Sequence, residues 1–178
     1  MPKSNIHLLK NFYKEMKFFF TLILFIFLSF GYSIAYELKV IDGDTIILNG
    51  DKIRFSGIDT PESYYRGKKQ ICYDGSTEVF CGDLSKKILV EKIGNNKVSC
   101  IKEKKPDKYK RILAECFVNN ISLSRYLVRS GYAFDYSYYS KKKFEKDQEY
   151  AKDNNLGLWK MKFEYPWVWR KKVREKKI

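Results

Sequence analysis

Histidine is almost absent from this chain of 178 residues, and the single one, His7, lies close to the N-terminus. Ser-His-Asp triads, histidine-ligated metal centres and histidine general bases all need an imidazole, so each is excluded for the rest of the chain. Zinc sites normally use Cys-x2-Cys pairs or histidines, and neither arrangement is present there. Any chemistry must therefore use carboxylates, guanidinium groups, lysine, tyrosine or a metal ion.

Acidic residues are few relative to basic ones. The chain carries 35 Lys and Arg against 21 Asp and Glu, which gives a formal net charge of +14. Such a charge favours an anionic partner, either nucleic acid or a membrane surface, without choosing between them. Aromatic residues make up 17% of the chain, which suits both a small core and the stacking of bases. The length allows one domain with short additions.

The first 35 residues have the composition of a signal peptide. Residues 18–30 are almost wholly apolar, lysines precede them, and Ser33-Ile34-Ala35 gives a small-x-small cleavage pattern. The apolar run is shorter than the roughly 20 residues that cross a bilayer. We therefore expect residues 1–35 to direct export to the periplasm or the medium, with Met16 as a possible true start. An uncleaved membrane anchor is the alternative.

Four cysteines follow the leader. An even number in a small exported domain favours disulfides over a metal site. Cys72 and Cys81 would close a long polar loop. Cys100 and Cys116 would meet across two strands if those strands pair antiparallel. We predict these two bridges.

Residues 41–62 have the pattern of a hairpin. Residues 45–48 and 53–58 are rich in β-branched and apolar side chains, which favour strands. Asn49-Gly50 lies between them, and this dipeptide is the strongest short hairpin signal because both residues tolerate positive φ. The two ends of the hairpin are therefore expected to lie together.

Carboxylates stand at both ends of this hairpin. Asp42 and Asp44 precede it, Asp59 and Glu62 follow it, and Arg54 lies on its second strand. Several carboxylates and one guanidinium at one end of a sheet indicate a hard metal ion and an anionic substrate. Asp-Gly-Asp and Asp-Thr-Pro are also ordinary turn sequences, so the pattern alone leaves a solvated turn open.

The remaining pattern is of the α+β class with mostly antiparallel strands. Further strands are predicted over residues 37–48, 97–101 and 112–118. Helices are predicted over residues 83–93, 122–130 and 140–155. Residues 63–80 are polar and predict a long loop, and residues 166–178 predict a basic tail that is disordered or acts as a non-specific electrostatic arm.

Two motifs far apart in the sequence resemble one known family. The first comprises residues 41–45, Arg54 and residues 58–62, and the second is Asp107-Lys108-Tyr109-Lys110-Arg111, followed by Leu113-Ala114. Their content and order are similar to the active-site segments of the staphylococcal nuclease (thermonuclease) family. One departure is Lys110, which stands where the family often has glycine. A positive φ there would cost on the order of 1 kcal/mol and would bear on the placement of Arg111.

The resemblance implies a fold and a metal site. The fold is a five-stranded Greek-key oligonucleotide-binding barrel with about three helices, over residues 36–165. Asp44 and Asp59, with the carbonyl group of Thr60, would hold a hard divalent ion. Oxygen ligands and an exported location favour Ca²⁺ over Mg²⁺.

The resemblance also implies catalytic and substrate-binding residues. Glu62 would act as general base or water-positioning group. Arg54 and Arg111 would contact phosphate oxygens, where charge builds in the transition state. Tyr109 and Tyr139 match positions that touch the nucleotide, although each is as well explained by packing in a chain with 14 tyrosines.

The implied activity is hydrolysis of both DNA and RNA with little sequence preference, leaving 3′-phosphate ends. A basic surface without a base-reading module fits such non-specificity. We expect a monomer that prefers single-stranded or unpaired substrate and needs no protein partner. Two other functions remain open: a catalytically silent oligonucleotide-binding module, and an exported module that binds anionic envelope polymers.

Overall fold

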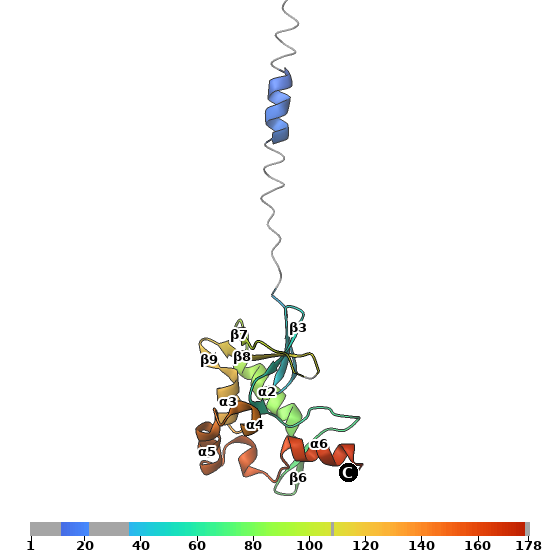
Figure 1. The fold of residues 1–178 in the computed structure, drawn as a ribbon, viewed down its shortest axis with the longest axis vertical. Helices are drawn as coiled ribbons and strands as arrows, with labels where there is room; N and C mark the ends of the chain where they lie inside the picture. The colour runs from blue at the N-terminus through green and yellow to red at the C-terminus, as the bar shows by residue number, and fades with distance from the viewer. Residues whose placement is uncertain (1–11, 22–35, 108, 177–178) are drawn as a thin grey trace, which may run out of the picture. The chain divides into compact units, whose positions relative to one another are not determined.

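The computed structural model describes residues 12–21, 36–107 and 109–176 of the chain (Figure 1). The chain divides into two compact units, Met1–Ala35 and Tyr36–Ile178, and each is described by itself. The second unit holds the sheet and the candidate site.

In the first unit, residues 12–21 form a helix. Most of the apolar run predicted as a signal peptide, and the whole cleavage pattern after it, lie outside the described residues. Within the part of the chain that is described, no helix is long and apolar enough to cross a membrane.

The main sheet of the second unit has the strand order β1-β2-β3-β8-β7, with β9 paired to β8. The strands are β1 (Leu38–Asp42), β2 (Thr45–Leu48), β3 (Asp51–Phe55), β7 (Ser99–Lys102), β8 (Ile112–Val118) and β9 (Ile121–Ser122). Only the central β3–β8 pair of this sheet is parallel. The α+β class is therefore observed. The five-stranded barrel is not confirmed, because no ladder between described residues closes β7 onto β1.

The predicted strand over residues 37–48 is two strands in the structure. β1 and β2 pair antiparallel, with Asp42 opposite Thr45, so the chain reverses at Gly43-Asp44. The Asp42 carboxylate accepts a hydrogen bond from the Gly43 amide at 2.8 Å and stabilises this reversal. The turn at Asn49-Gly50 forms as predicted, with φ of 51° and 84°.

The polar segment predicted as a loop over residues 63–80 contains a second hairpin. Its strands are β5 (Ile71–Asp74) and β6 (Thr77–Phe80), which turn at Gly75. The sequence pattern missed them because most of their side chains are exposed and carry no apolar alternation.

Both predicted disulfides are present. Cys72 is bonded to Cys81, at the base of the β5–β6 hairpin. Cys100 is bonded to Cys116, its directly paired residue in the antiparallel β7–β8 ladder. Among the described residues no cysteine is free.

Removing the Cys100–Cys116 bridge should lower the free energy of unfolding by about 3 kcal/mol, since it closes a loop of 16 residues. The variant is Cys100→Ala with Cys116→Ala, and urea unfolding measures the loss. Cys72→Ala with Cys81→Ala is the matched control, and its shorter loop of 9 residues should cost slightly less. A double variant as stable as the parent would contradict the expectation.

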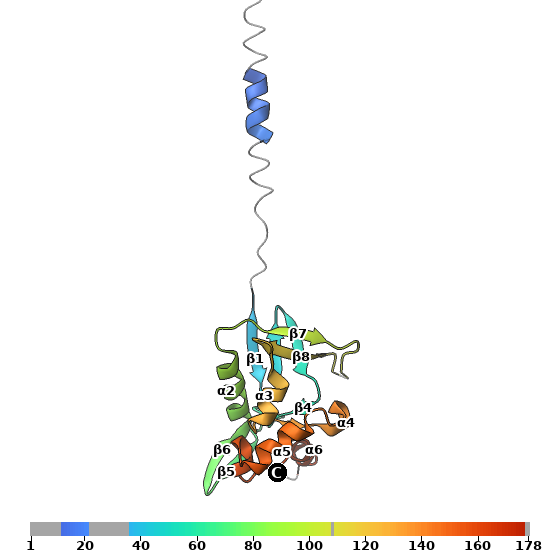
Figure 2. The ribbon, with the colours of Figure 1, turned by 90° about the vertical axis from the view of Figure 1, so that its left-hand side faces the viewer.

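Helices cover the sheet and gather at the end of the unit away from β7 in both views (Figures 1 and 2). Figure 2 shows α2 lying beside β1. The helical elements are α2 (Cys81–Ile93), α3 (Leu123–Arg129), α4 (Ser137–Ser140), α5 (Glu145–Asp153), the 3₁₀ turn η1 (Gly157–Lys160) and α6 (Pro166–Arg174). The main core lies between the sheet, α2 and α3 and includes Ile46, Ile53, Phe55, Leu89 and Leu127.

Three helices were expected, and two of them begin or continue differently. α2 starts at Cys81, so Asp83 is an acidic residue of its first turn and not its N-cap. The long helix expected over residues 140–155 is shortened to α5, which begins at Glu145, because Lys141 and Lys142 have φ of 55° and 66°; the short helix α4 ends at Ser140, just before them. α3 forms nearly as predicted, and the Ser122 hydroxyl accepts a hydrogen bond from the Arg125 amide as its N-cap.

The predicted basic tail is a packed helix, which corrects the sequence prediction. Pro166 opens α6, where its missing N–H costs nothing. Trp169 and Val173, four residues apart, point inward and are buried. A second small core contains an aromatic cluster, in which Phe134 of β10 (Phe134–Asp135) is surrounded by side chains from η1, from the segment before α6 and from α6 itself: Trp159, Phe163, Tyr165 and Trp167.

Candidate active site

A buried ion-pair network forms at one end of the β2–β3 hairpin. Asp44 lies in the turn before β2, and pairing of Thr45 with Arg54 brings that guanidinium beside it. Arg54 Nη1 pairs with Asp44 Oδ1, and Arg54 Nη2 donates to Asp59 Oδ1 at 2.6 Å. Both aspartates are fully buried. The structure thus brings together the two aspartates and the arginine that the sequence singled out.

Asp44 also fixes the short strand β4 (Ile58–Asp59), which carries Asp59. Asp44 Oδ2 accepts hydrogen bonds from the Thr60 amide at 3.1 Å and from the Thr60 hydroxyl at 2.9 Å. β4 pairs on its other side with β10 (Phe134–Asp135), where Phe134 stands opposite Asp59. Asp59 and Thr60 are therefore held from two directions.

A second arginine enters the network from the C-terminal helix. Arg170 Nη2 donates to Asp59 Oδ2 at 2.6 Å, and Nη1 lies 3.1 Å from Asp59 Oδ1 and 2.5 Å from Glu62 Oε1. The pattern of residues 166–178 predicts a basic tail and therefore gives no indication of a site residue there. The spacing of Pro166, Trp169 and Val173 was the signal that would have predicted a helix there.

Glu62 lies at the edge of the network, with its side chain 15% exposed. Burial raises the pKa of its carboxyl group from 4.5 to about 7, and the Arg170 guanidinium opposes that rise. Its backbone packs against the start of α2 at Gly82, where a Cβ atom would stand 2.1 Å from the Glu62 carbonyl carbon. Only glycine allows this approach, so the position of Glu62 depends on Gly82.

Asp42 supports the site from the turn. Its Oδ1 accepts from the Gly43 amide and from the Ser63 hydroxyl at 2.9 Å, which links the β1–β2 turn to the chain after Glu62. Burial, and then the negative charge of Asp44, raise the pKa of its carboxyl group to about 6.

Arg111 is not among the groups that the structure joins to this network. Arg111 Nε and Nη2 lie 2.7 and 2.6 Å from Asp107 Oδ2, within its own turn. Lys110 in that turn has φ of 61°, the conformation for which the family glycine is suited. The Asp107 carboxylate also accepts from the amides of Tyr109 and Arg111, which holds the turn closed.

The two tyrosines matched to nucleotide-contacting positions are both on the surface. The Tyr109 ring is 67% exposed, and the Arg111 guanidinium lies 5.4 Å from its centroid. Tyr139 is 63% exposed and packs against Tyr136 and Tyr138 at 5.1 and 4.9 Å between centroids. Their predicted contact with nucleotide stays a prediction.

The donor set at this end of the hairpin fits a hard divalent cation in its chemistry. Asp44, Asp59 and the Thr60 carbonyl offer only oxygen, and one guanidinium spans both carboxylates. Within the described residues, no group of three or more His, Cys, Asp or Glu side chains is arranged to hold a metal ion. Arg54 and Arg170 neutralise these aspartates in the structure, and Asp44 and Asp59 are the two acidic residues that would hold the ion.

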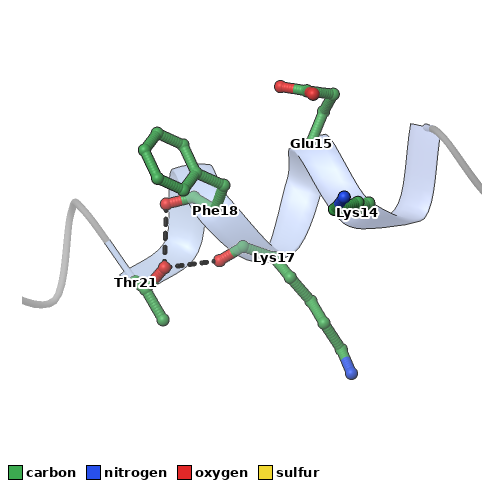
Figure 3. Close-up of a pocket in the computed structure, with 5 residues that line it drawn as sticks. All are labelled: Lys14, Glu15, Lys17, Phe18 and Thr21. Atoms are coloured by element: carbon green, nitrogen blue, oxygen red, sulfur yellow. Dashed lines mark hydrogen bonds between the residues drawn. The ribbon is translucent and has the colours of Figure 1, made fainter.

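A surface pocket on the first unit offers no comparable chemistry. Figure 3 shows its lining residues on one short helix, and the Thr21 hydroxyl donates within that helix to the Lys17 and Phe18 carbonyls at 2.8 and 2.9 Å. We place the candidate site in the second unit.

Comparison with known proteins identifies the family of this chain. The model of the family described as "Staphylococcal nuclease homologue" matches residues 52–161, more than half of the chain. The chain belongs to this staphylococcal nuclease family. The matched segment contains Arg54, Asp59, Thr60, Glu62 and Arg111. It contains neither Asp44 nor Arg170, which the structure adds to the same site.

Several relatives share part of this nuclease-family chain. The succinoglycan biosynthesis protein ExoI of Rhizobium meliloti is 28% identical over 131 residues, which are 72% of this chain and 66% of that protein. The SPbeta prophage-derived endonuclease YokF of Bacillus subtilis is 34% identical over 132 residues, covering 68% of this chain and 42% of YokF. The probable staphylococcal-like nuclease CAN3 of Oryza sativa is 27% identical, and the match covers 79% of this chain and 34% of CAN3. Both nucleases are therefore matched over less than half of their length.

Proposed function

We propose that the protein is an exported, Ca²⁺-dependent nuclease that hydrolyses phosphodiester bonds in DNA and RNA with little sequence preference. Membership of the nuclease family and the nuclease names of its relatives support a hydrolytic role. The observation that carries the proposal is the buried Asp44–Arg54–Asp59 network with Glu62 at its edge. A protein that only grips phosphate has no need of an acidic cluster facing it.

The binding residues have distinct tasks. Asp44, Asp59 and the Thr60 carbonyl would hold Ca²⁺, which supplies positive charge to a phosphate oxygen and to the attacking water. Arg54 uses three of its N–H groups on Asp44, Asp59 and the Ile58 carbonyl. A guanidinium has five N–H donors, so two remain for phosphate oxygens. Both N–H groups of Nη2 are taken by Asp59 and the Ile58 carbonyl, so the free donors are on Nε and Nη1, and each would serve one phosphate oxygen.

Glu62 is assigned the proton transfer. It is the one acid of the hairpin motif that is neither a proposed ligand nor committed to the β1–β2 turn as Asp42 is. Its side chain is 15% exposed, so the residue lies at the boundary between the network and solvent. When ionised, it would accept the proton of a water molecule that attacks phosphorus.

The chemistry of the chain supports an exposed polyanion as substrate. The net charge of +14 attracts phosphate without reading sequence. We expect single-stranded or unpaired stretches to be preferred and a monomer to suffice. Export through residues 1–35 would place the enzyme where Ca²⁺ is plentiful.

One observation favours a second candidate, a catalytically silent nucleic-acid-binding module. Arg111 is held by Asp107 and not by the site, which leaves the predicted second phosphate-contacting arginine engaged elsewhere. In that case the protein would bind single strands without cutting them. The same assay separates the two candidates.

Chelation should abolish cleavage of single-stranded DNA, and added Ca²⁺ should restore it. In the proposed mechanism Ca²⁺ supplies positive charge to the phosphate and to the attacking water, and both contributions are lost when it is removed. Gel analysis of a labelled oligonucleotide measures the cleavage, and fluorescence anisotropy measures binding in the same buffers. Full activity in chelator would refute the metal assignment. Binding without cleavage in Ca²⁺ would support the silent module.

A further inference from the structure

The C-terminal helix α6 is held against the site by packing. Its face of Pro166, Trp169 and Val173 is buried, and the Trp169 ring lies 6.3 Å from that of Tyr65, which follows the hairpin motif. Trp167 stacks on Tyr136 at 5.3 Å, with an angle of 8° between the rings. The position of Arg170 is therefore set by a docked helix and not by a flexible arm.

A buried amide gives the same region a second link. Gln70 is fully buried, its Oε1 accepts from the Glu62 amide at 3.2 Å, and its Nε2 donates to the Glu164 carbonyl at 2.7 Å. The backbone N–H of Gln70 donates to the Glu62 carbonyl at 3.1 Å. The backbone of Glu62 is thus joined to the segment that enters α6, while its side chain is joined to α6 itself through Arg170.

The Arg170 guanidinium spans two carboxylates of the site. Both oxygens of Asp59 and one of Glu62 accept its hydrogen bonds. Since a planar fork fixes the direction as well as the distance of its acceptors, it holds the two carboxylates in one relative placement. Asp59 accepts from Arg54 as well, so three of its roughly four acceptor directions are already taken.

We propose that Arg170 is a positioning residue of the active site, which holds Glu62 in place relative to Asp59. This inference rests on the proposed nuclease function and extends it. The family match ends at residue 161, so the functional unit reaches beyond the matched segment to include α6, drawn in red in Figure 1. Arg170 acts through the two carboxylates and is not assigned a contact with substrate.

Arg170→Gln should lower kcat about tenfold or more, because a small misplacement of a catalytic group costs that much or more. The KM for single-stranded DNA should change less than about threefold, since the proposed binding groups remain. Arg174→Gln is the matched control: it removes the same charge from an exposed position of the same helix. Its kcat should equal that of the parent protein.

A double-mutant cycle separates positioning from a general loss of structure. If Arg170 acts through Glu62, the kcat of Arg170→Gln with Glu62→Gln should lie within about threefold of that of Glu62→Gln alone. Multiplying losses, or an equal loss in Arg174→Gln, would overturn the proposal. If Arg170→Gln does not fold, Arg170→Lys carries the test. It keeps the charge but cannot reach both carboxylates with one fork, so its kcat should still fall.

A second readout does not depend on nuclease activity. The parent protein, Arg170→Gln, Glu62→Gln and the double variant are unfolded by urea in the presence of chelator. The shift in midpoint of the double variant should differ from the sum of the shifts of the two single variants. Additive shifts would overturn the positioning contact. If the parent protein has no nuclease activity but the midpoint shifts are coupled, the proposed function is refuted. The contact between Arg170 and Glu62 would still be established.

Discussion

Replacing Glu62 with glutamine should lower kcat by roughly 10²-fold or more, which is the usual worth of a positioned general base. The change keeps size and shape and removes the charge that accepts a proton. Asp44, Asp59 and Arg54 remain in contact with one another, so binding of single-stranded DNA in Ca²⁺ should keep its affinity and its salt dependence. Cleavage kinetics and anisotropy titrations measure the two effects separately.

The pH dependence of the cleavage rate should also report the ionisation of Glu62. A carboxylate accepts a proton only when it is ionised, and burial raises the pKa of Glu62 to about 7 in the metal-free protein. Activity should therefore fall as the pH decreases, along a limb at or below about pH 7, because nearby Ca²⁺ would lower this pKa. Glu62→Gln should remove that limb from the residual activity.

Glu91→Gln is the matched control, since Glu91 is exposed on α2 and pairs only loosely with Lys87 at 3.8 Å. It should leave kcat and the pH profile unchanged. An unchanged kcat in Glu62→Gln would make that residue a bystander and would turn attention to Asp42. A collapse of metal affinity would instead make Glu62 a ligand.

The site could be predicted from the sequence where it is built from local pairing. Asn49-Gly50 sets the register of β2 and β3, and this register alone brings Asp44 next to Arg54. Asp59 follows a few residues later, so its approach also follows from the hairpin. The Cys100–Cys116 disulfide could be predicted for the same reason, because the two cysteines stand opposite each other in one ladder.

The parts of the site that the sequence does not predict come from segments far apart in the chain. Arg170 reaches Asp59 across 111 positions of sequence, and no local pattern relates the two. A lysine- and arginine-rich end has the composition of a disordered arm, and only burial of Trp169 and Val173 shows otherwise. Gln70 was missed because a buried amide has no sequence signal. Its role depends on the hairpin β5–β6 and on the entry to α6.

Arg54→Lys should abolish most of the activity while the protein stays folded. Lysine keeps the charge, but a single ammonium cannot reach Asp44 and Asp59 as the two Nη atoms do and still keep N–H groups free for phosphate. The loss should appear in kcat and in kcat/KM alike, as expected of a contact made in the transition state. Arg66→Lys, at an exposed loop position, is the matched control for the chemical change. A circular dichroism spectrum checks the fold.

The Arg111→Lys variant tests whether Arg111, which pairs with Asp107 in the structure, contacts phosphate during catalysis or only closes its own turn. If Arg111 leaves Asp107 to contact phosphate, its lysine variant should lose activity as Arg54→Lys does. Lys110→Gly should raise the free energy of unfolding whichever role Arg111 has, because glycine adopts the φ of 61° without the cost that lysine bears. If Arg111→Lys cuts at the parent rate, Arg111 serves only to close its turn. The guanidinium groups of the site are then Arg54 and Arg170, which already share the Asp59 carboxylate.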